Sequence, residues 1–479
     1  MNSGALLLCI ATPFAASLLI VLNHKRPQLI NVINTVAPFI SLLALILFMT
    51  AYSPMVDSEI TLLNIVGNIG IAFSAEPLAL IFAGLVCVLW PLSSLYAMSY
   101  MYGNKLKRTT HFFACYSLAI GSALGIAFAD NLLTLFIFYE ILTFSTYPLV
   151  IHSRSAEALK AGWLYLLTLV GTATLFLLTA IIWIGYSTGT LDFEKGGILQ
   201  NYMGATEITV LLLLVVLGTT KAAIMPLHHW LPSAMVAPVP VSALLHAVAV
   251  VKAGVFTIMK IAVYTFGIDT LREVGADWFV YLASFTIVAA SIVAIRQVQL
   301  KKLLAYSTIS QLSYIVLGVA ILHPVALLGA VLHIVAHGFA KITLFFGAGA
   351  IYTASGLSRI RELDGIGRAM PWTMGLFTIA SLSIIGMPPL IGLTSKWFLL
   401  EGAVAANAYF AVVVLVLGSI LSAAYLLPII HRAFFRPGKD LSHGEAPLVM
   451  RVAMLVPVLI CVLLFFFNDK IIALVRGIL

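Results

Sequence analysis

The sequence contains very little charge. Only 9% of its 479 residues are Asp, Glu, Lys or Arg, whereas 62% are hydrophobic, and a soluble globular chain has roughly 25% charged residues. This composition excludes a water-soluble protein and is typical of a chain that crosses a membrane many times. The longest polar stretches, around residues 188–202 and 432–447, are only loop-sized. No soluble domain therefore interrupts the membrane part.

Cysteine and cofactor motifs are also scarce. The four cysteines, Cys9, Cys87, Cys115 and Cys461, stand singly in apolar runs, without the paired spacing of a zinc or iron–sulfur site. The sequence has no glycine-rich nucleotide-binding motif. We therefore expect no cofactor and no bound metal, and neither a redox nor a hydrolytic site within this chain.

Apolar runs dominate what is present. A membrane-spanning helix needs about 20 apolar residues, and runs of that length predict an all-α polytopic membrane protein of about fourteen spans. Residues 1–479 form a single membrane domain in this interpretation. The predicted span centres are Pro13, Ser41, Val86, Ala119, Phe138, Thr174, Leu214, Val251, Ile287, Val316, Phe339, Ala380, Val414 and Leu459.

Basic residues alternate between the loops and so predict the orientation. Seventeen of the 26 lysines and arginines follow odd-numbered spans, whereas only Lys195 and Arg272 lie in loops after even-numbered spans. By the positive-inside rule the odd loops are cytoplasmic, which places both termini on the extracytoplasmic side. The net charge of +8 is then a topology signal and gives no reason to expect a nucleic-acid partner. Lys25 and Arg26 follow the first apolar run, so we expect a retained span and not a cleaved signal peptide.

Five lysines lie inside apolar runs. A lysine at the centre of a membrane helix costs about 2.5 to 3.5 kcal/mol on insertion scales, so such residues usually face the bundle interior and indicate function. Lys260, near the end of its run, fits a side chain that reaches the membrane surface equally well. Glu76 and Asp130 stand at span starts and are expected at the interface. The five lysines are Lys221, Lys252, Lys260, Lys341 and Lys396.

Glu140, within LFIFYEILTFSTYPL, is the acidic residue best placed near the membrane middle. A buried carboxylate needs a partner or a proton, and Lys221, two spans later, is the expected partner. Two such charges about 4 Å apart attract by roughly 4 kcal/mol at an effective dielectric constant near 20. The pair fits a charge switch, and it also fits a permanent ion pair that only fixes helix packing.

Prolines predict two broken helices. Pro226 breaks the seventh span just after Lys221, and Pro388 and Pro389 break the twelfth just before Lys396. Broken helices at membrane depth often mark the ion site of a transporter. If spans 4–8 and 9–13 form two five-helix repeats, both breaks fall in the fourth span, and the odd number of spans makes the repeats inverted. The predicted divisions are residues 1–108, 109–268, 274–435 and 436–479.

The stretch VLHIVAHGFAKITLFFGAG, residues 331–349, holds three titratable groups. His333, His337 and Lys341 are spaced by four, which places them on one stripe of a helix. They extend over about 12 Å, so water must bridge the steps between them. Histidine suits proton transfer because its unperturbed pKa is near neutrality. Two satisfied core histidines beside a structural lysine are the alternative.

Long motifs identify a family. TKAAIMPLHHWLPSAMVAPVPVSALLHAVAVVKAGVF, KKLLAYSTISQLSYIVLG, LHIVAHGFAKITLFFGAGAIY and GMPPLIGLTSKWF resemble the antiporter-like membrane subunits shared by respiratory complex I, membrane-bound hydrogenases and Mrp-type cation/proton antiporters. The resemblance extends from about Phe112 to Phe435. The D-type subunits of Mrp antiporters are the nearest in appearance, although hydrogenase-associated members also share motifs. The acidic residue that the family often has before the KRLLAYSS-like run is missing here, where RQVQL stands instead.

The resemblance implies a function and a set of residues. It implies a proton-translocating subunit of a multi-subunit Na⁺ or K⁺/proton antiporter in the cell (inner) membrane, whose partners are other membrane subunits. A proton-pumping subunit of a redox-driven complex, such as a complex I-like NADH dehydrogenase or a membrane-bound hydrogenase, is the alternative. Further alternatives are a self-contained antiporter and a membrane subunit with an inert, structural role. The residues that match the family's hydrated axis are Glu140, Lys221, His246, Lys252, His333, His337, Lys341 and Lys396.

Overall fold

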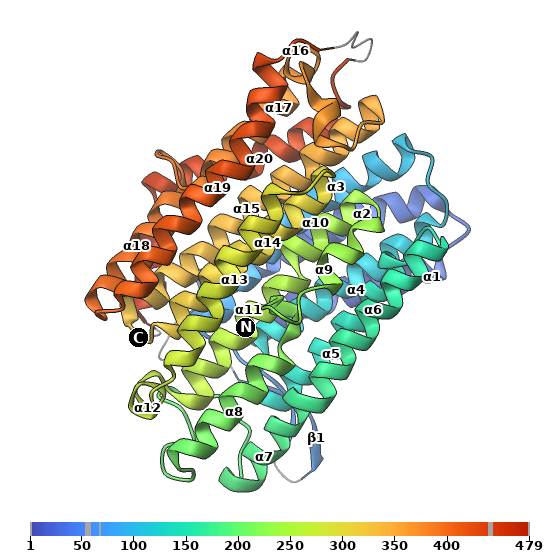
Figure 1. Cartoon of the computed structure of the whole chain (residues 1–479). Helices are drawn as coiled ribbons and strands as arrows, with labels where there is room; N and C mark the ends of the chain where they lie inside the picture. The colour runs from blue at the N-terminus through green and yellow to red at the C-terminus, as the bar shows by residue number, and fades with distance from the viewer. Residues whose placement is uncertain (1, 53–58, 67–68, 439–443, 478–479) are drawn as a thin grey trace.

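The computed structural model describes residues 2–52, 59–66, 69–438 and 444–477. In these residues, twelve helices are long and apolar enough to cross a membrane, and two shorter apolar helices cover Ala205–Gly218 and Pro371–Ile385. The helices run side by side in one bundle (Figure 1). Each predicted span centre lies in one of these helices, and the chain is an all-α, multi-pass membrane protein.

The N-terminal part contains three long helices and a hairpin that was not predicted from the sequence. Strands β1 and β2 pair antiparallel between the second and third helices. Their sequences, ITLLNIV and IGIAF, are rich in β-branched residues, which suit a pleated strand. The elements are α1 (Asn2–Leu22), α2 (Pro27–Thr50), β1 (Ile60–Val66), β2 (Ile69–Phe73) and α3 (Pro77–Gly103).

We call residues 109–268 the first unit. Its long helices include stretches of π-helix, and its fourth apolar helix ends early. The elements are α4 (Thr109–Phe128), α5 (Leu132–Val150), α6 (Ala156–Thr172), η1 (Ala173–Leu178), α7 (Thr179–Thr188), α8 (Ala205–Gly218), η2 (Thr220–Ala222), α9 (Trp230–Ser233), η3 (Ala234–Val236), α10 (Val239–Ala243), η4 (Leu244–Val248), α11 (Val250–Ile261) and η5 (Ala262–Phe266).

We call residues 274–435 the second unit, which the short α12 (Ile268–Val274) precedes. One further long helix and a short terminal helix follow it. The elements are α13 (Asp277–Ile295), α14 (Leu300–Ala320), α15 (Pro324–Ser355), η6 (Ile360–Leu363), α16 (Ile366–Ala369), α17 (Pro371–Ile385), α18 (Ile391–Ala405), α19 (Tyr409–Phe435), α20 (Leu448–Phe466) and α21 (Asp469–Arg476).

The structure confirms both predicted breaks. Helix α8 ends at Gly218, and Ala223 adopts a positive φ of 56° before Pro226. Helix α17 ends at Ile385, Gly386 has a φ of 96°, and α18 begins only at Ile391. Proline has no backbone N–H to continue a helix, so the chain leaves the helical path at both places. Each break exposes backbone groups inside the bundle.

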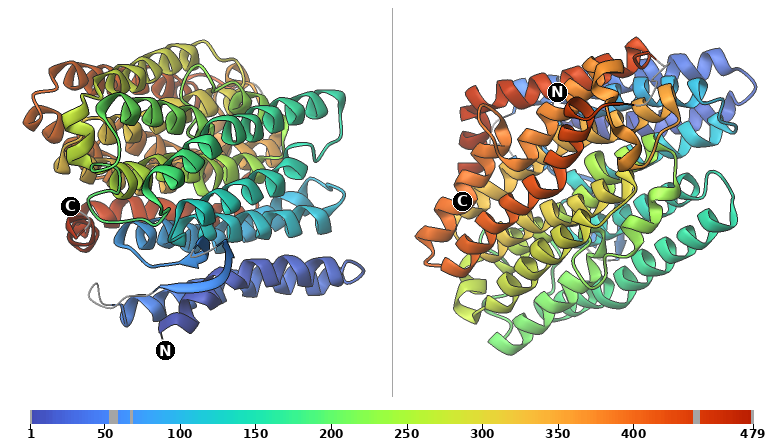
Figure 2. Two further views of the ribbon diagram at one scale, coloured as in Figure 1. Left: turned by 90° about the horizontal axis from the view of Figure 1, so that it is seen from below. Right: turned by 45° about the horizontal axis from the view of Figure 1, so that its top comes forward.

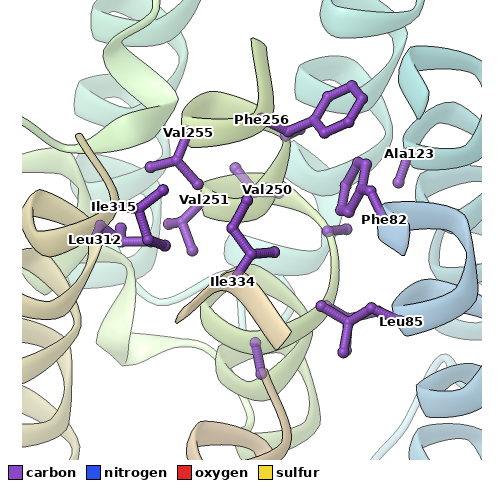
Figure 3. Packing of buried hydrophobic residues seen from close by; sticks show 14 of the residues in the cluster. Phe82, Leu85, Ala123, Val250, Val251, Val255, Phe256, Leu312, Ile315 and Ile334 are labelled. Carbon is purple, nitrogen blue, oxygen red and sulfur yellow. The ribbon is translucent and has the colours of Figure 1, made fainter. Parts of the chain in front are cut away.

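The helices that carry most of the titratable residues lie in the interior. The span Val239–Phe266 is fully buried and α15 is 94% buried, whereas α1 and α2 are only 39% buried and lie at an edge (Figure 2). Figure 3 shows Leu312 and Ile315 of α14 beside Val251 and Val255 of α11. This apolar packing separates the central helices from the lipid, so their lysines cannot extend to the membrane surface.

Candidate functional site

The eight predicted site residues lie inside the bundle. We call this set the polar row. Seven of its members are at most 9% exposed, and Glu140 is partly buried. They come from α5, from the break after α8, from η4 and α11, and from α15 and α18. The row comprises Glu140, Lys221, His246, Lys252, His333, His337, Lys341 and Lys396.

Lys221 lies in the 3₁₀ turn that follows α8, and its side chain points to α5. Its Nζ donates a hydrogen bond to the Tyr139 carbonyl oxygen at 2.9 Å and lies 3.2 Å from the centroid of the Tyr139 ring. A cation above an aromatic face is attracted by the ring quadrupole. Gly254 of α11 packs against this turn so closely that a Cβ there would overlap the main chain of Lys221 and Ala222. The break and this glycine together position the lysine.

Glu140 follows Tyr139 on α5, but it forms no direct ion pair with Lys221. The four ion pairs found in the described residues do not include it, and both of its carboxylate oxygens are buried without a hydrogen-bond partner. The expected ion pair is therefore absent, because Tyr139 already binds the ammonium group. A buried carboxylate without a partner is stable only when it is protonated or hydrated, which argues against a permanent packing pair.

A short hydrogen bond joins the two units at the centre of the row. Lys252 Nζ of α11 lies 2.7 Å from His337 Nδ1 of α15. His337 Nε2 is buried without a partner, and both ring nitrogens of His246 are also unpartnered. The His246 ring lies in the π-helix η4, 4.7 Å from the ring of Phe345. Buried polar atoms without partners are rare and call for a functional explanation or for water.

Lys341 begins a chain of polar side chains on neighbouring helices. Its Nζ donates to Ser307 Oγ at 2.6 Å, Ser307 donates to the Tyr425 hydroxyl at 3.1 Å, and Tyr425 donates to Ser422 Oγ at 3.2 Å. Gln311 Nε2 also donates to Ser422, at 3.1 Å. The ammonium group is therefore satisfied by a hydroxyl and has no acidic partner among the described residues.

His333 lies at the other end of this chain. Its Nε2 is 3.2 Å from Gln311 Oε1, and its Nδ1 is 2.9 Å from Ser395 Oγ of α18. The His333 and His337 ring centroids are 6.3 Å apart, too far for a direct hydrogen bond. A proton that passes between them needs a bridging water.

Lys396 binds the carboxyl end of a broken helix. Its Nζ donates to the carbonyl oxygens of Ile384 and Ile385 at 2.9 and 3.1 Å and to Ser419 Oγ at 3.2 Å. It also lies 4.8 Å from the centroid of the Tyr314 ring. The end of a helix carries a partial negative charge that stabilises a cation. A pocket of about 270 Å³ borders Lys396, so this end of the row is the less enclosed.

Several polar partners were not predicted from the sequence. Ser307, Gln311, Ser422 and Tyr425 complete the network around Lys341 and His333. Single hydroxyl and amide groups are common in membrane helices, where they bond within or between helices. The available signal was spacing, because Ser307 and Gln311 are four residues apart and so share one face of a helix.

Lys260 and Glu76 also differ from expectation. The Lys260 side chain is fully buried; its Nζ lies 3.3 Å from Glu76 Oε1 and donates to the Ala129 carbonyl oxygen at 2.6 Å. The Glu76 side chain is 16% exposed. Neither residue extends to the membrane surface, because Glu76 at the start of α3 and Ala129 at the end of α4 enclose the ammonium group. The first unit thus contains a second buried lysine site.

The described residues contain no group of three or more His, Cys, Asp or Glu side chains arranged to hold a metal ion. Two cysteines that are distant in sequence are nevertheless neighbours, since Cys9 Sγ and Cys87 Sγ lie 3.7 Å apart in the apolar interior. Both cysteines are free thiols.

Fold and site together define a polytopic membrane protein with a buried row of titratable side chains that runs between two broken helices. Broken helices beside buried charges are typical of membrane proteins that move ions. Residues 129–422 match the family described as NADH:quinone oxidoreductase/Mrp antiporter, transmembrane. The chain belongs to this family, which confirms the resemblance seen in the sequence.

Three relatives share about a third of the residues. The chain is 33% identical to NADH-quinone oxidoreductase subunit N of Desulforudis audaxviator, over 84% of this chain and 83% of the relative. It is 32% identical to the A/B subunit of a probable K⁺/H⁺ antiporter of Rhizobium meliloti, over 94% of this chain and 46% of the relative. It is 30% identical to the A-type subunit of a Na⁺/H⁺ antiporter of Alkalihalophilus pseudofirmus, over 92% and 58%. The chain thus spans about half the length of these two antiporter subunits.

Two solved structures share the fold. A chain of the membrane-bound sulfane sulfur reductase, an archaeal respiratory membrane complex, aligns with a TM-score of 0.88 at 24% identity over 99% of this chain and 96% of that chain. A chain of the Mrp complex from Dietzia sp. aligns with a TM-score of 0.88 at 20% identity over 100% and 96%. The similarity covers the whole bundle, including both broken helices.

Proposed function

We propose that this chain is the proton-translocating subunit of a multi-subunit Na⁺ or K⁺/proton antiporter and that protons move along the polar row. The observation that carries this proposal is the hydrogen bond of 2.7 Å between Lys252 and His337. It connects the titratable groups of the first unit to those of the second in the buried middle of the bundle. Groups that only stabilised each unit would not need this connection.

Each part of the row has a role in the proposal. Glu140 and Lys221 act as a charge switch: Lys221 binds the neutral Tyr139 carbonyl, and a move towards Glu140 would replace this contact with an ion pair. His246, Lys252, His333, His337 and Lys341 relay protons, with water between those groups that lie too far apart for direct transfer. Lys396 is the end group of the second unit.

The two units are proposed to be inverted repeats. In each unit the fourth apolar helix, α8 or α17, ends at a break. The lysine at each break lies over a tyrosine of the second helix of its unit: Lys221 over Tyr139 and Lys396 over Tyr314. A shared cation–ring contact at equivalent positions supports a common origin, and it makes residues 109–268 and 274–435 natural subdivisions beside the 1–108 and 436–479 segments.

We place the chain in the cell (inner) membrane with both termini on the extracytoplasmic side, as the distribution of lysine and arginine supports. Other membrane subunits of the same complex are its proposed partners, because the relatives named above are themselves subunits. No cofactor of its own is part of the proposed mechanism.

A second candidate function has an observation in its favour. The subunit N relative matches this chain over 83% of its own length, against 46% and 58% for the two antiporter subunits. In that case the polar row would pump protons in response to electron transfer in other chains. Neighbouring genes that encode small antiporter subunits favour the first function, whereas genes for iron–sulfur or nickel proteins favour the second.

Proton flux in inverted vesicles that carry the intact complex separates the two functions. Flux is measured after addition of Na⁺, of K⁺ or of an electron donor, and vesicles without the complex serve as the control. Antiport predicts flux that follows one of the cations without a donor. Flux that appears only with the donor overturns the antiporter proposal in favour of the redox-driven pump.

A further inference from the structure

His333 has a hydrogen-bond partner on each ring nitrogen, unlike the other two histidines of the polar row. Nε2 faces Gln311 Oε1 at 3.2 Å, and Nδ1 faces Ser395 Oγ at 2.9 Å. Among the described residues, His246 has no partner on either nitrogen, and His337 has one only on Nδ1. The side chain of His333 is buried, so its partners determine where its proton resides.

The direction of the hydrogen bonds determines the orientation of the Gln311 amide. Ser422 has one hydroxyl proton, which it donates to the Gly418 carbonyl oxygen at 2.8 Å. Ser422 Oγ therefore acts as an acceptor towards Tyr425, at 3.2 Å, and towards Gln311, at 3.1 Å. The Gln311 nitrogen must consequently face Ser422, and the amide oxygen must face His333.

An amide oxygen can only accept a hydrogen bond. His333 Nε2 must then carry a proton and donate it to Gln311 Oε1. In the neutral imidazole the other nitrogen, Nδ1, has a free lone pair. Ser395 is the donor available to that lone pair.

Ser395 has one hydroxyl proton and two acceptors within reach. Its Oγ is 2.9 Å from His333 Nδ1 and 3.0 Å from the Gly392 carbonyl oxygen in the first turn of α18. When the ring is neutral, the hydroxyl donates to Nδ1. When the ring gains a second proton, Nδ1–H donates to Ser395 Oγ and the hydroxyl turns to Gly392. Both charge states are thus fully hydrogen-bonded without movement of the backbone.

We propose that Gln311 fixes His333 as the Nε2–H tautomer and that Ser395 is a rotating hydroxyl that accepts the second ring proton at Nδ1. Both are positioning residues that act through His333, and the inference rests on the proposed function, in which His333 relays protons. Ser395 precedes Lys396 in α18, so the rotation links the charge of His333 to the broken helix of the second unit.

The charged and titratable neighbours of His333 set the conditions for this switch. Lys252 on α11 and Lys396 on α18 act on the ring electrostatically, and His337 is the neighbour on its own helix. From α14, the Tyr314 ring stacks at 5.5 Å. Because like charges repel at short range in a low-dielectric interior, a second proton on His333 is favoured when a neighbouring lysine has given up its own.

Nitrogen NMR tests the tautomer directly. The intact complex, with ¹⁵N-labelled histidine and in lipid, is compared with the His333→Gln variant, and the signals that disappear are assigned to His333. At alkaline pH we expect a neutral ring with its proton on Nε2. A proton on Nδ1 overturns the inference whatever the transport activity, so this result is separate from any failure of the proposed function.

Two variants distinguish the roles of the partners. Gln311→Leu should give a mixture of tautomers, whereas Ser395→Ala should keep the proton on Nε2. Charged groups gain more from a hydrogen bond than neutral ones, so Ser395→Ala should shift the half-maximal pH of flux down by about one to two pH units, and Ser395→Thr, which retains the hydroxyl, should restore it. An unshifted pH profile in Ser395→Ala overturns the role of Ser395.

Discussion

The two units solve the same problem in different ways. Each places a lysine at a break in its fourth helix and over a tyrosine ring, at 3.2 Å for Lys221 and Tyr139 and at 4.8 Å for Lys396 and Tyr314. In the first unit a carboxylate, Glu140, follows the tyrosine, whereas in the second unit an isoleucine stands after Tyr314. Lys396 binds the carboxyl end of α17 instead.

The comparison teaches where a switch can operate. A helix end presents a fixed partial charge that cannot be protonated. A carboxylate can change between charged and neutral forms, so the environment of Lys221 has two electrostatic states and that of Lys396 has one. We therefore assign the switching step to the first unit and the terminal proton-binding step to the second.

The largest expected effect comes from removal of the carboxylate that distinguishes the units. Glu140→Gln should abolish cation-driven proton flux while the complex still assembles, because the amide retains the shape and loses the charge. Flux in inverted vesicles and the yield of purified complex are the measurements. Glu401→Gln, which changes an exposed glutamate at the end of α18, is the matched control. Normal flux in Glu140→Gln would remove the switch from the first unit.

A smaller but still large effect is expected where α11 packs on the first break. Gly254→Ala adds a methyl group that overlaps the main chain of Lys221 and Ala222, so the turn that positions Lys221 must shift. Overpacking of this kind typically costs about 1 to 3 kcal/mol, and we expect a lower Tm of the complex together with reduced flux. Gly171→Ala serves as the control, since a Cβ there meets no atom within 4 Å. Equal effects of the two substitutions would contradict this account of how Lys221 is positioned.

The aromatic contacts should give the smallest and most graded difference. A desolvated cation–ring contact contributes about 2 kcal/mol and a weaker one about 0.5 to 1 kcal/mol, which correspond to roughly 30-fold and a few-fold changes in an equilibrium constant. Tyr139→Leu should therefore reduce flux more than Tyr314→Leu, because its ring is the closer to its lysine. Phenylalanine at either position keeps the ring and should be milder. A larger loss in Tyr314→Leu would reverse the comparison.

Much of the fold could be predicted because a membrane restricts the possibilities. Length and apolarity placed the spans, and Pro226, Pro388 and Pro389 placed the breaks, since proline removes a backbone donor wherever it stands. Lysines in apolar runs identified most of the polar row, because their insertion cost is the same in any fold. The hairpin from Ile60 to Phe73 escaped prediction because short apolar runs fit a strand or a helix equally well.

Partner choice could not be read from the sequence. Lys221 binds Tyr139 and not Glu140, and Lys260 binds Glu76 inside the bundle. Each result depends on how helices distant in the sequence rotate against one another, to which composition and spacing are insensitive. The same is true of the hydroxyl and amide groups that surround His333, since their importance follows only from the directions of their hydrogen bonds.

The most direct test of the central claim, that protons pass along the polar row, is the flux of Lys341→Ala. Cation-driven proton flux is measured in inverted vesicles at expression matched to the parent, with Lys160→Ala, an exposed lysine of α6, as the control. The account predicts that flux vanishes in Lys341→Ala and persists in Lys160→Ala, because only Lys341 belongs to the buried network. Undiminished flux in Lys341→Ala, under a cation gradient or with an electron donor, would show that the buried row is structural and would contradict the account.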